Sequence, residues 1–269
     1  MKRFSWIMGL ILCVVCTVQA KDRVIERPPF LAWSSSNIEV DKIVMSDTVT
    51  TVYIKAFYRP KYWIKIASGS FLKDEKGALY PIRKGVGITL DKEFWMPESG
   101  EAEFQLTFPP IPQNVTRLDF SEGDFEGAYK IWGIQLDKKS FGKFKLPKDV
   151  IVPKADHKMT LPDPIVKYDK AILKGRILDY QKGMPDKGSL YYQDVIREGA
   201  QEGKIRIQDD GTFYHEMNVF MITPCTIMFP FGTIEYLLAP GETTSIVINL
   251  RENARKQSHL RQTEKPYGK

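Results

Sequence analysis

Alternating apolar and polar positions dominate much of this 269-residue chain and predict β-strands. The alternation is strict over residues 101–108, and Val52, Ile54 and Ala56 fall on one face of the run at 51–56. Such a strand buries one face and wets the other. Further β-type runs lie at residues 37–45, 48–58, 63–67, 69–73, 78–86, 116–120 and 128–136. Turn signals separate these runs, so residues 21–145 are predicted to form an immunoglobulin-like β-sandwich.

A second β module is predicted over residues 171–250. Its β-type runs lie at residues 171–179, 203–208, 212–219, 226–229, 234–238 and 244–250. Pro240-Gly241 predicts a hairpin between the last two runs, and Asp209-Asp210-Gly211 predicts a tight turn. The helical candidate at 189–198 has a weak pattern. The fold class is therefore all-β, with two antiparallel β-sandwich-like modules, the second a small sandwich or barrel.

A connector and a polar tail flank the second module. Residues 146–170 form a Pro-rich linker punctuated by Pro147, Pro153, Pro162 and Pro164, and proline favours an extended, semi-rigid chain. We therefore expect little contact between the modules. Residues 251–269 form a basic tail that is nearly free of apolar residues, so it is expected to be frayed or disordered.

The N-terminus predicts export. Lys2 and Arg3 precede an apolar run at residues 4–15, and small residues end at Ala20, so we predict a signal peptide at 1–20 that is cleaved after Ala20. The alternative is a membrane anchor, but the run is shorter than the roughly 20 residues that span a bilayer. Lipidation is disfavoured because Val15, rather than a small residue, precedes Cys16. The expected location is the periplasm, either free or peripheral to a membrane, with no transmembrane segment.

The charge distribution argues against nucleic-acid binding. Of the net charge of +6, Lys2 and Arg3 supply two, and the tail from Arg251 carries six basic residues against Glu252 and Glu264. The body between them is therefore neutral. A nucleic-acid interface needs basic residues on a folded face, so none is expected.

Candidate chemistry is sparse, and no catalytic, cofactor-binding or metal-binding residue is assigned. Cleavage after Ala20 removes Cys13 and Cys16 and leaves Cys225, in a strand-like run typical of a small core residue; the alternative is a reactive thiol. Three further features do not amount to a site: His157, His215 and His259 lack metal-ligand spacing, Asp209-Asp210-Gly211 lacks the remaining ligands of a calcium loop, and Ser34-Ser35-Ser36 lacks a nucleophile motif. Asn114-Val115-Thr116 matches a glycosylation sequon that an exported bacterial protein is not expected to use.

Aromatic residues are dense in the first module. They include Trp33, Tyr58, Tyr62, Trp63, Phe94, Trp95 and Trp132. Exposed rows of such rings could stack on sugars, whereas Trp and Tyr also fill sandwich cores. We favour core positions, because Trp63 and Trp132 lie within otherwise apolar runs.

Several motifs carry a family resemblance. They are Met96-Pro97-Glu98-Ser99-Gly100, Leu118-Asp119-Phe120-Ser121, Ile131-Trp132-Gly133, Leu173-Lys174-Gly175, Asp210-Gly211-Thr212-Phe213 and Leu238-Ala239-Pro240-Gly241. In this order they resemble the N-terminal, non-catalytic half of exported TlpA-like, thioredoxin-family thiol-disulfide oxidoreductases of Gram-negative bacteria. In that family a thioredoxin domain with a C-x-x-C motif follows, and no position here matches its redox residues.

The resemblance implies a non-catalytic periplasmic module that binds a protein partner, a substrate or an appended redox domain. The alternative is a carbohydrate- or cell-surface-binding module, suggested by the aromatic density and by export. A hydrolase has no support beyond export and a few unmatched acidic residues.

Overall fold

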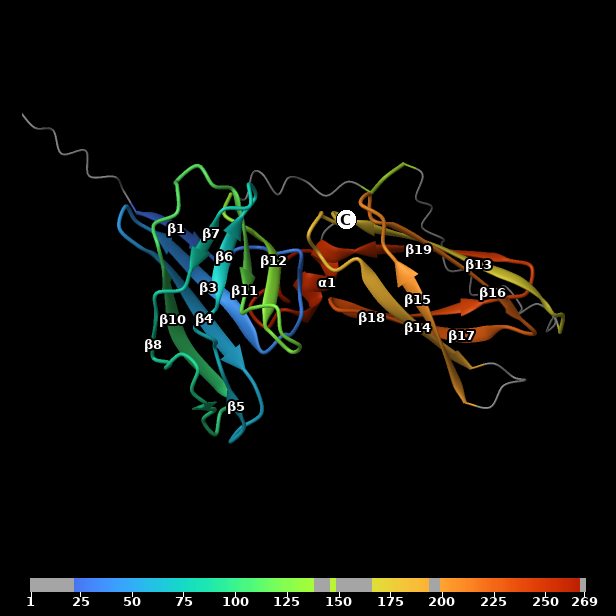
Figure 1. The fold of residues 1–269 in the computed structure, drawn as a ribbon, viewed down its shortest axis with the longest axis horizontal. Coiled ribbons are helices and arrows are strands. Elements are labelled where there is room, and N and C mark those ends of the chain that lie inside the picture. Colours follow the sequence, from blue (N-terminus) through green and yellow to red (C-terminus); the bar gives the residue numbers. More distant parts are fainter. Residues whose placement is uncertain (1–21, 138–145, 149–165, 194–198, 267–269) are drawn as a thin grey trace, which may run out of the picture.

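The computed structural model describes residues 22–137, 146–148, 166–193 and 199–266, and it is almost entirely β (Figure 1). Two β modules lie side by side along the long axis, and the single described helix, α1 (Leu250–Gln257), lies between them. The predicted all-β, sandwich-like fold class is confirmed. The predicted signal peptide at 1–20, residues 149–165 of the linker and His157 lie outside the described residues.

The first module has two five-stranded sheets. The first sheet has the order β1 (Arg23–Glu26), β3 (Ile38–Met45), β4 (Thr50–Phe57), β10 (Glu101–Phe108) and β8 (Lys84–Val86). The second sheet has the order β2 (Ala32–Trp33), β12 (Lys130–Gln135), β11 (Arg117–Ser121), β6 (Phe71–Asp74) and β7 (Leu79–Pro81). Alternate side chains of β4 and β10 point inward and join Leu72 and Phe120 in one core, as the sequence periodicity requires. A two-stranded ribbon, β5 (Trp63–Ile64) with β9 (Phe94–Trp95), extends from the lower end of this module in Figure 1.

The second module also has two sheets. One has the order β16 (Thr212–Val219), β13 (Asp169–Leu178) and β19 (Thr243–Asn249). The other has the order β15 (Ala200–Arg206), β14 (Lys187–Gln193), β17 (Thr223–Phe229) and β18 (Gly232–Leu238). Phe213 of β16 packs edge-on against Phe229 of β17, with ring centroids 5.6 Å apart, so the core joins both sheets. Gly175 allows this packing, because a Cβ there would lie 1.9 Å from Cζ of Phe213.

Two local predictions in this module are wrong. The turn at Pro240-Gly241 forms, but β18 pairs with β17 while β19 pairs in parallel with β13, so the chain switches sheets there instead of making a hairpin. The part of the predicted helix that the structure describes, residues 189–193, belongs to β14, whose cross-strand neighbours decide its conformation. The turn predicted at Asp209-Asp210-Gly211 is present: Gly211 has a φ of +81°, and the Asp210 carboxylate accepts the Thr212 N–H.

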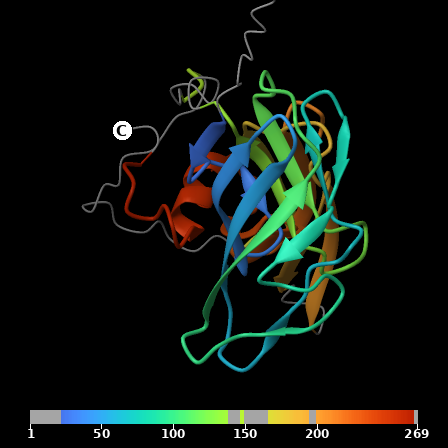
Figure 2. The same cartoon turned by 90° about the vertical axis from the view of Figure 1, so that its left-hand side faces the viewer.

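The C-terminal segment was predicted to be frayed or disordered, and this prediction is wrong for residues 251–266. Asn249 caps α1 by accepting the Glu252 N–H, and the helix buries Leu250 and Ala254. Arg251 makes two hydrogen bonds to the Asp179 carboxylate, at 2.6 and 2.8 Å, which fixes the helix to the end of β13. Figure 2 shows the C-terminal segment (red) beside the early strands (blue) of the first module.

The expectation of little contact between the modules is also wrong. Leu31, Ala32 and Trp132 of the first module belong to the core cluster of the second, and Ala254 belongs to that of the first. Gly133 permits the approach of Leu31, because a Cβ at Gly133 would lie 2.7 Å from the Leu31 side chain. The modules therefore share apolar contacts that neither sequence pattern revealed.

Candidate binding surfaces

The structure first shows where the weighed chemical candidates lie. Cys225 is 3% exposed on β17, where burial raises the pKa of its thiol to about 11, so it is a core residue as predicted. Burial lowers the pKa of His215 on β16, whereas His259 lies in the C-terminal segment and stacks on Phe57 of β4 in the first module. Among the described residues, no group of three or more His, Cys, Asp or Glu side chains could hold a metal ion.

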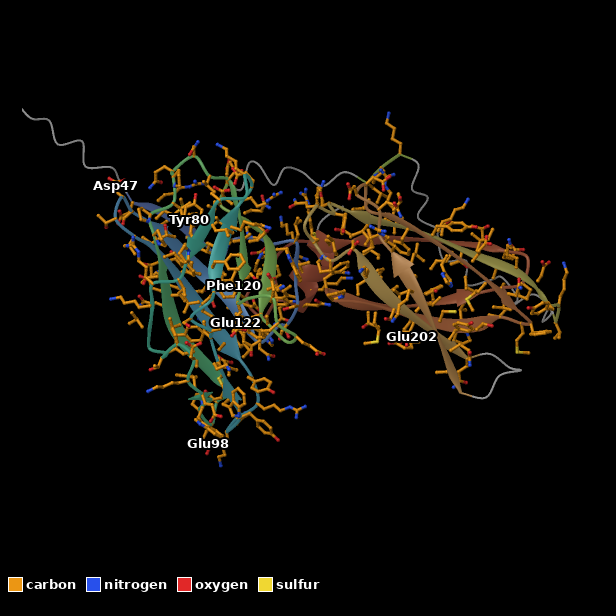
Figure 3. The ribbon with its side chains drawn as sticks, in the orientation of Figure 1. Asp47, Tyr80, Glu98, Phe120, Glu122 and Glu202 are labelled. Carbon is orange, nitrogen blue, oxygen red and sulfur yellow. The ribbon has the colours of Figure 1, made fainter. Side chains whose placement is uncertain are left out.

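The buried carboxylates beside the first core hold loops in place. Glu122 accepts the backbone N–H groups of Ala67 and Tyr129, and burial raises its pKa despite these bonds (Figure 3). Burial alone would raise the pKa of Asp74 as well, but bonds from Ala78 and Tyr80, among others, hold it below its usual value. Each carboxylate accepts hydrogen bonds from nearby protein donors, so its role is to hold the surrounding loops rather than to transfer protons.

The β5–β9 ribbon carries an exposed pair of indoles. Trp63 and Trp95 are directly opposed in the antiparallel register, so their side chains project from the same face. They are 45% and 61% exposed. The other face of the ribbon points into the core: Ile64 is buried, and the ring of Phe94 lies 6.3 Å from that of Phe104. Packing in the core therefore does not explain why tryptophan occupies these two positions.

Polar and aromatic residues are close in sequence to the two indoles. Tyr62 is half exposed, and the Arg59 guanidinium lies 5.7 Å from the centre of its ring. The exposed side chains of Lys61 and Glu98 form an ion pair at 3.0 Å, and Figure 3 places Glu98 at the tip of the module. The β5–β9 ribbon thus carries two exposed indoles, with hydrogen-bonding side chains close to them in sequence.

The prediction that the tryptophans occupy core positions holds for Trp33 and Trp132, which are buried, and is wrong for Trp63 and Trp95. Sequence reasoning misplaced Trp63 because Ile64, the next residue of its run, is buried on the opposite face of the ribbon, and Ile66, just beyond the ribbon, is buried as well. The sequence did contain one signal of this exposure: neighbouring residues of a strand point to opposite faces, so Trp63 and Ile64 cannot both be buried in the same core. The pairing of Trp63 with Trp95 then places both indoles on the exposed face.

A groove of about 310 Å³ lies on the outer face of the first sheet. Lys55 and Glu103 bridge its floor at 3.1 Å, and this hydrogen bond raises the pKa of Lys55. Lys42 places its ammonium 4.2 Å from the centre of the Tyr53 ring at one side. The groove is lined by the acidic Asp41 and Glu103 and by the basic Lys55.

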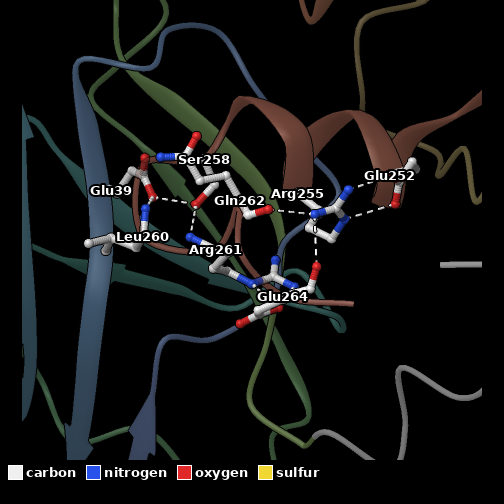
Figure 4. Close-up of polar contacts among 8 residues, drawn as sticks. All are labelled: Glu39, Glu252, Arg255, Ser258, Leu260, Arg261, Gln262 and Glu264. Atoms are coloured by element: carbon white, nitrogen blue, oxygen red, sulfur yellow. Dashed lines mark hydrogen bonds and ion pairs between the residues drawn. The ribbon is translucent and has the colours of Figure 1, made fainter. Parts of the chain in front are cut away.

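The C-terminal segment docks on the same outer face. The Glu39 carboxylate, on a residue that is 1% exposed, accepts hydrogen bonds from the Ser258 hydroxyl and the Leu260 N–H (Figure 4). It also accepts one from the His259 N–H. Trp33 adds a hydrogen bond from its Nε1 to Gln257 Oε1 at 3.1 Å. These contacts, with those of Arg251 to Asp179, connect α1 to both modules.

Arg255 organises the end of this segment. Its guanidinium pairs with the Glu252 carboxylate and donates to the carbonyl oxygens of Gln262 and Glu264 (Figure 4). Arg261, also buried, pairs with the Glu264 side chain. The basic residues that made this segment look unstructured therefore supply its internal hydrogen bonds.

Comparisons with known proteins show no family for this chain. No protein-family model and no curated protein matches it. Among solved structures, a pullulanase type I from Bacillus subtilis complexed with maltose has a TM-score of 0.27 and 9% identity, over 75% of this chain and 24% of that one. A pullulanase from Anoxybacillus sp. complexed with maltotriose has a TM-score of 0.25 and 13% identity, over 70% and 24%. The Bacillus anthracis TIE protein has a TM-score of 0.21 and 9% identity, over 85% and 40%.

The chain thus spans less than half the length of these proteins, and scores this low do not show a shared fold. Within the described residues, no helix is long and apolar enough to cross a membrane.

Proposed function

We propose that this protein is a glycan- or cell-surface-binding module and that Trp63 and Trp95 form its contact surface. The observation that carries the proposal is their direct cross-strand pairing on the ribbon face turned away from the core. Exposed large apolar side chains that gather in one patch mark interaction sites in soluble proteins. Exposed indole faces of this kind can stack on sugar rings.

The chemistry of the border favours a saccharide. The axial C–H face of a pyranose packs on an indole, and its hydroxyls at the ring edge need hydrogen-bond partners. Lys61 and Glu98, two and three positions along the chain from Trp63 and Trp95, form an exposed ion pair and supply donors and acceptors. The surface is open, so it suits a segment within a longer polysaccharide.

Retention on insoluble cellulose, chitin and peptidoglycan tests the proposal. Wild type should be retained on at least one of them, and Trp63→Ala or Trp95→Ala should weaken binding about tenfold, the equivalent of roughly 1.4 kcal/mol per ring. Tyr214→Ala is the matched control, because Tyr214 is an exposed ring on the second module. Absence of retention on all three polymers, or equal retention of the tryptophan variants, would contradict the proposal.

Docking of a protein partner is the second candidate, and the same indole pair favours it because Trp is enriched at protein–protein hot spots. Under this proposal the partner is the redox domain or substrate of a TlpA-like oxidoreductase, as the motif resemblance implies. A purified thioredoxin-like domain should then bind wild type and lose affinity for Trp95→Ala, whereas the polysaccharides should not bind at all.

We also propose that the protein acts after export to the periplasm. The basis is the leader-like pattern of residues 1–20. Mass spectrometry of the protein from an osmotic-shock fraction should give an N-terminus at Lys21. An intact Met1 on protein recovered from the cytoplasm would overturn this proposal.

A further inference from the structure

A cleft of about 500 Å³ lies where three distant segments meet. Its walls come from the loop that follows Trp33 in the first module, from the β17–β18 turn with Phe231 in the second, and from Gln257 at the end of α1. Ligand sites concentrate at such junctions between folded units, and this volume lies within the usual range for them.

The lining is uncharged throughout, although 27% of the chain's residues are charged. Trp33 and Phe231, both largely buried, supply the apolar part. Ser34, Ser36 and Gln257 are exposed at the edge and supply hydroxyl and amide groups. A charged ligand would lose hydration here without gaining a countercharge, so the cleft suits a neutral ligand that combines an apolar face with hydroxyl groups.

Hydrogen bonds fix the walls of the cleft in advance. Trp33 Nε1 donates to Gln257 Oε1 at 3.1 Å, which engages the carbonyl oxygen of that amide and leaves its NH₂ group as a donor for a ligand. The Ser34 hydroxyl donates to the Ala128 carbonyl and accepts from the Lys130 N–H, both at 2.9 Å, which holds the serine loop in place. Binding would therefore require little ordering of the protein.

We propose that this cleft is a second binding site, for a neutral polyhydroxylated ligand of the size of a mono- to trisaccharide. The site is distinct from the Trp63–Trp95 surface and rests on different observations, namely the uncharged lining and the fixed junction. The serine and glutamine side chains bond the ligand hydroxyls, and the apolar face of the ligand lies toward Trp33 and Phe231.

The experiment uses the full chain carrying Trp63→Ala and Trp95→Ala, so that a saccharide cannot bind at the ribbon. Saturation-transfer NMR and calorimetry are run with maltotriose, cellotriose and triacetylchitotriose. At least one probe should bind this double variant. If wild type binds a probe and the double variant binds none, the proposal of a site in the cleft is overturned and the proposal of a site on the ribbon is supported. Absence of binding to both proteins would overturn the cleft as well.

Two cleft variants in that background locate the binding. Gln257→Glu keeps the acceptor for Trp33 but replaces the NH₂ donor, and it should weaken binding at least about fivefold. Ser36→Arg should abolish binding by filling the cleft and adding charge. Gln193→Arg introduces the same charged side chain at an exposed position outside the cleft and should leave binding unchanged. Thermal unfolding verifies that each variant is folded. Equal affinity in Ser36→Arg and Gln193→Arg would place the ligand elsewhere and overturn the proposal.

Discussion

The Glu39 carboxylate accepts a hydrogen bond of 2.7 Å from the Ser258 hydroxyl, across 219 positions of the chain. Both residues are almost completely buried, and the backbone N–H groups of His259 and Leu260 complete the carboxylate's coordination. The turn that starts at Ser258 presents these N–H groups to the carboxylate as the first turn of a helix does. One acidic residue of the first module thus holds the C-terminal segment in place.

Glu39→Gln should destabilise the protein by about 2 kcal/mol, because the amide loses the charge that three donors require and turns an NH₂ group toward some of them. Chemical denaturation measures the loss. Trypsin should also cleave at Lys256 and Arg261 faster than in wild type. Glu103→Gln is the control: the Glu103 side chain is 74% exposed in its ion pair with Lys55, so the substitution should cost less than about 1 kcal/mol. Equal losses in the two variants would contradict the role of Glu39.

Cleavage of the connector should not separate the modules. Limited proteolysis is predicted to cut first between Pro147 and Pro164, as the proline-rich sequence indicates. Because Leu31 and Trp132 pack in the second core and α1 contacts both modules, the two fragments should elute together from a size-exclusion column. In a Glu39→Arg variant cleaved in the same way, the fragments should separate more readily, because the carboxylate that holds the C-terminal segment is lost. Dissociation of the wild-type fragments without denaturant would contradict a shared interface.

Periodicity was sufficient where one face of a strand meets the core. The strands β10 and β16 were predicted with their observed bounds, because their alternation reflects burial on one side. The same reasoning failed for β14, in which Tyr191 and Tyr192 are both partly exposed, so the strand shows no clean alternation. Its conformation depends on β15, whose paired residues lie 7 to 19 positions away, and on β17, whose paired residues lie 33 to 39 positions away.

The surfaces proposed for binding were harder to predict for two reasons. Exposure of Trp63 and Trp95 follows from a pairing across about thirty positions of sequence, which no local pattern encodes. Docking of the C-terminal segment depends on buried polar partners, and hydrophobicity reports Glu39, Arg255 and Arg261 as solvent-facing. The burial of a carboxylate cannot be predicted from sequence when its hydrogen-bond donors lie in a distant segment of the chain.

The exposed and buried tryptophans should differ in their effect on stability. Trp63→Ala and Trp95→Ala should each cost less than about 1 kcal/mol, since much of each ring already meets water. Trp132→Ala should cost about 3–5 kcal/mol, because this ring is 8% exposed and lies between the modules. Denaturant titration compares the three. A loss above about 2 kcal/mol for Trp95→Ala would mean that the ribbon needs its indole for folding.

Cys225 should make stability fall at alkaline pH. Burial raises the pKa of its thiol from an ordinary 9.0 to about 11, so the unfolded chain releases a proton in this window while the folded chain retains it. The contribution is complete below pH 9.0 and is lost as the pH rises toward 11. Burial also raises the pKa of Tyr236 beside it, with the same sign. Cys225→Ala should cost about 1–2 kcal/mol at neutral pH and show a shallower alkaline decline, because the Tyr236 share remains.

Thiol labelling checks the same residue independently. A reagent should modify native Cys225 slowly and the denatured chain quickly, because access and thiolate character control reactivity. Stoichiometric labelling of the native protein within seconds at neutral pH would show that the thiol is not a core group.

Gly175 should be among the least replaceable positions of the second module. It lies opposite Phe213 in the β13–β16 register, and a Cβ there would lie 1.9 to 2.3 Å from three carbons of that ring. Phe213 cannot move freely, since it is buried and packs edge-on against Phe229. Gly175→Ala should therefore cost about 2–3 kcal/mol through overpacking. Gly69→Ala is the matched control, because a Cβ there meets no atom within 4 Å, and its effect should stay within about 1 kcal/mol of wild type. Denaturant titration compares the two variants. Equal stability would contradict the tight packing of the Phe213 ring against the Gly175 backbone.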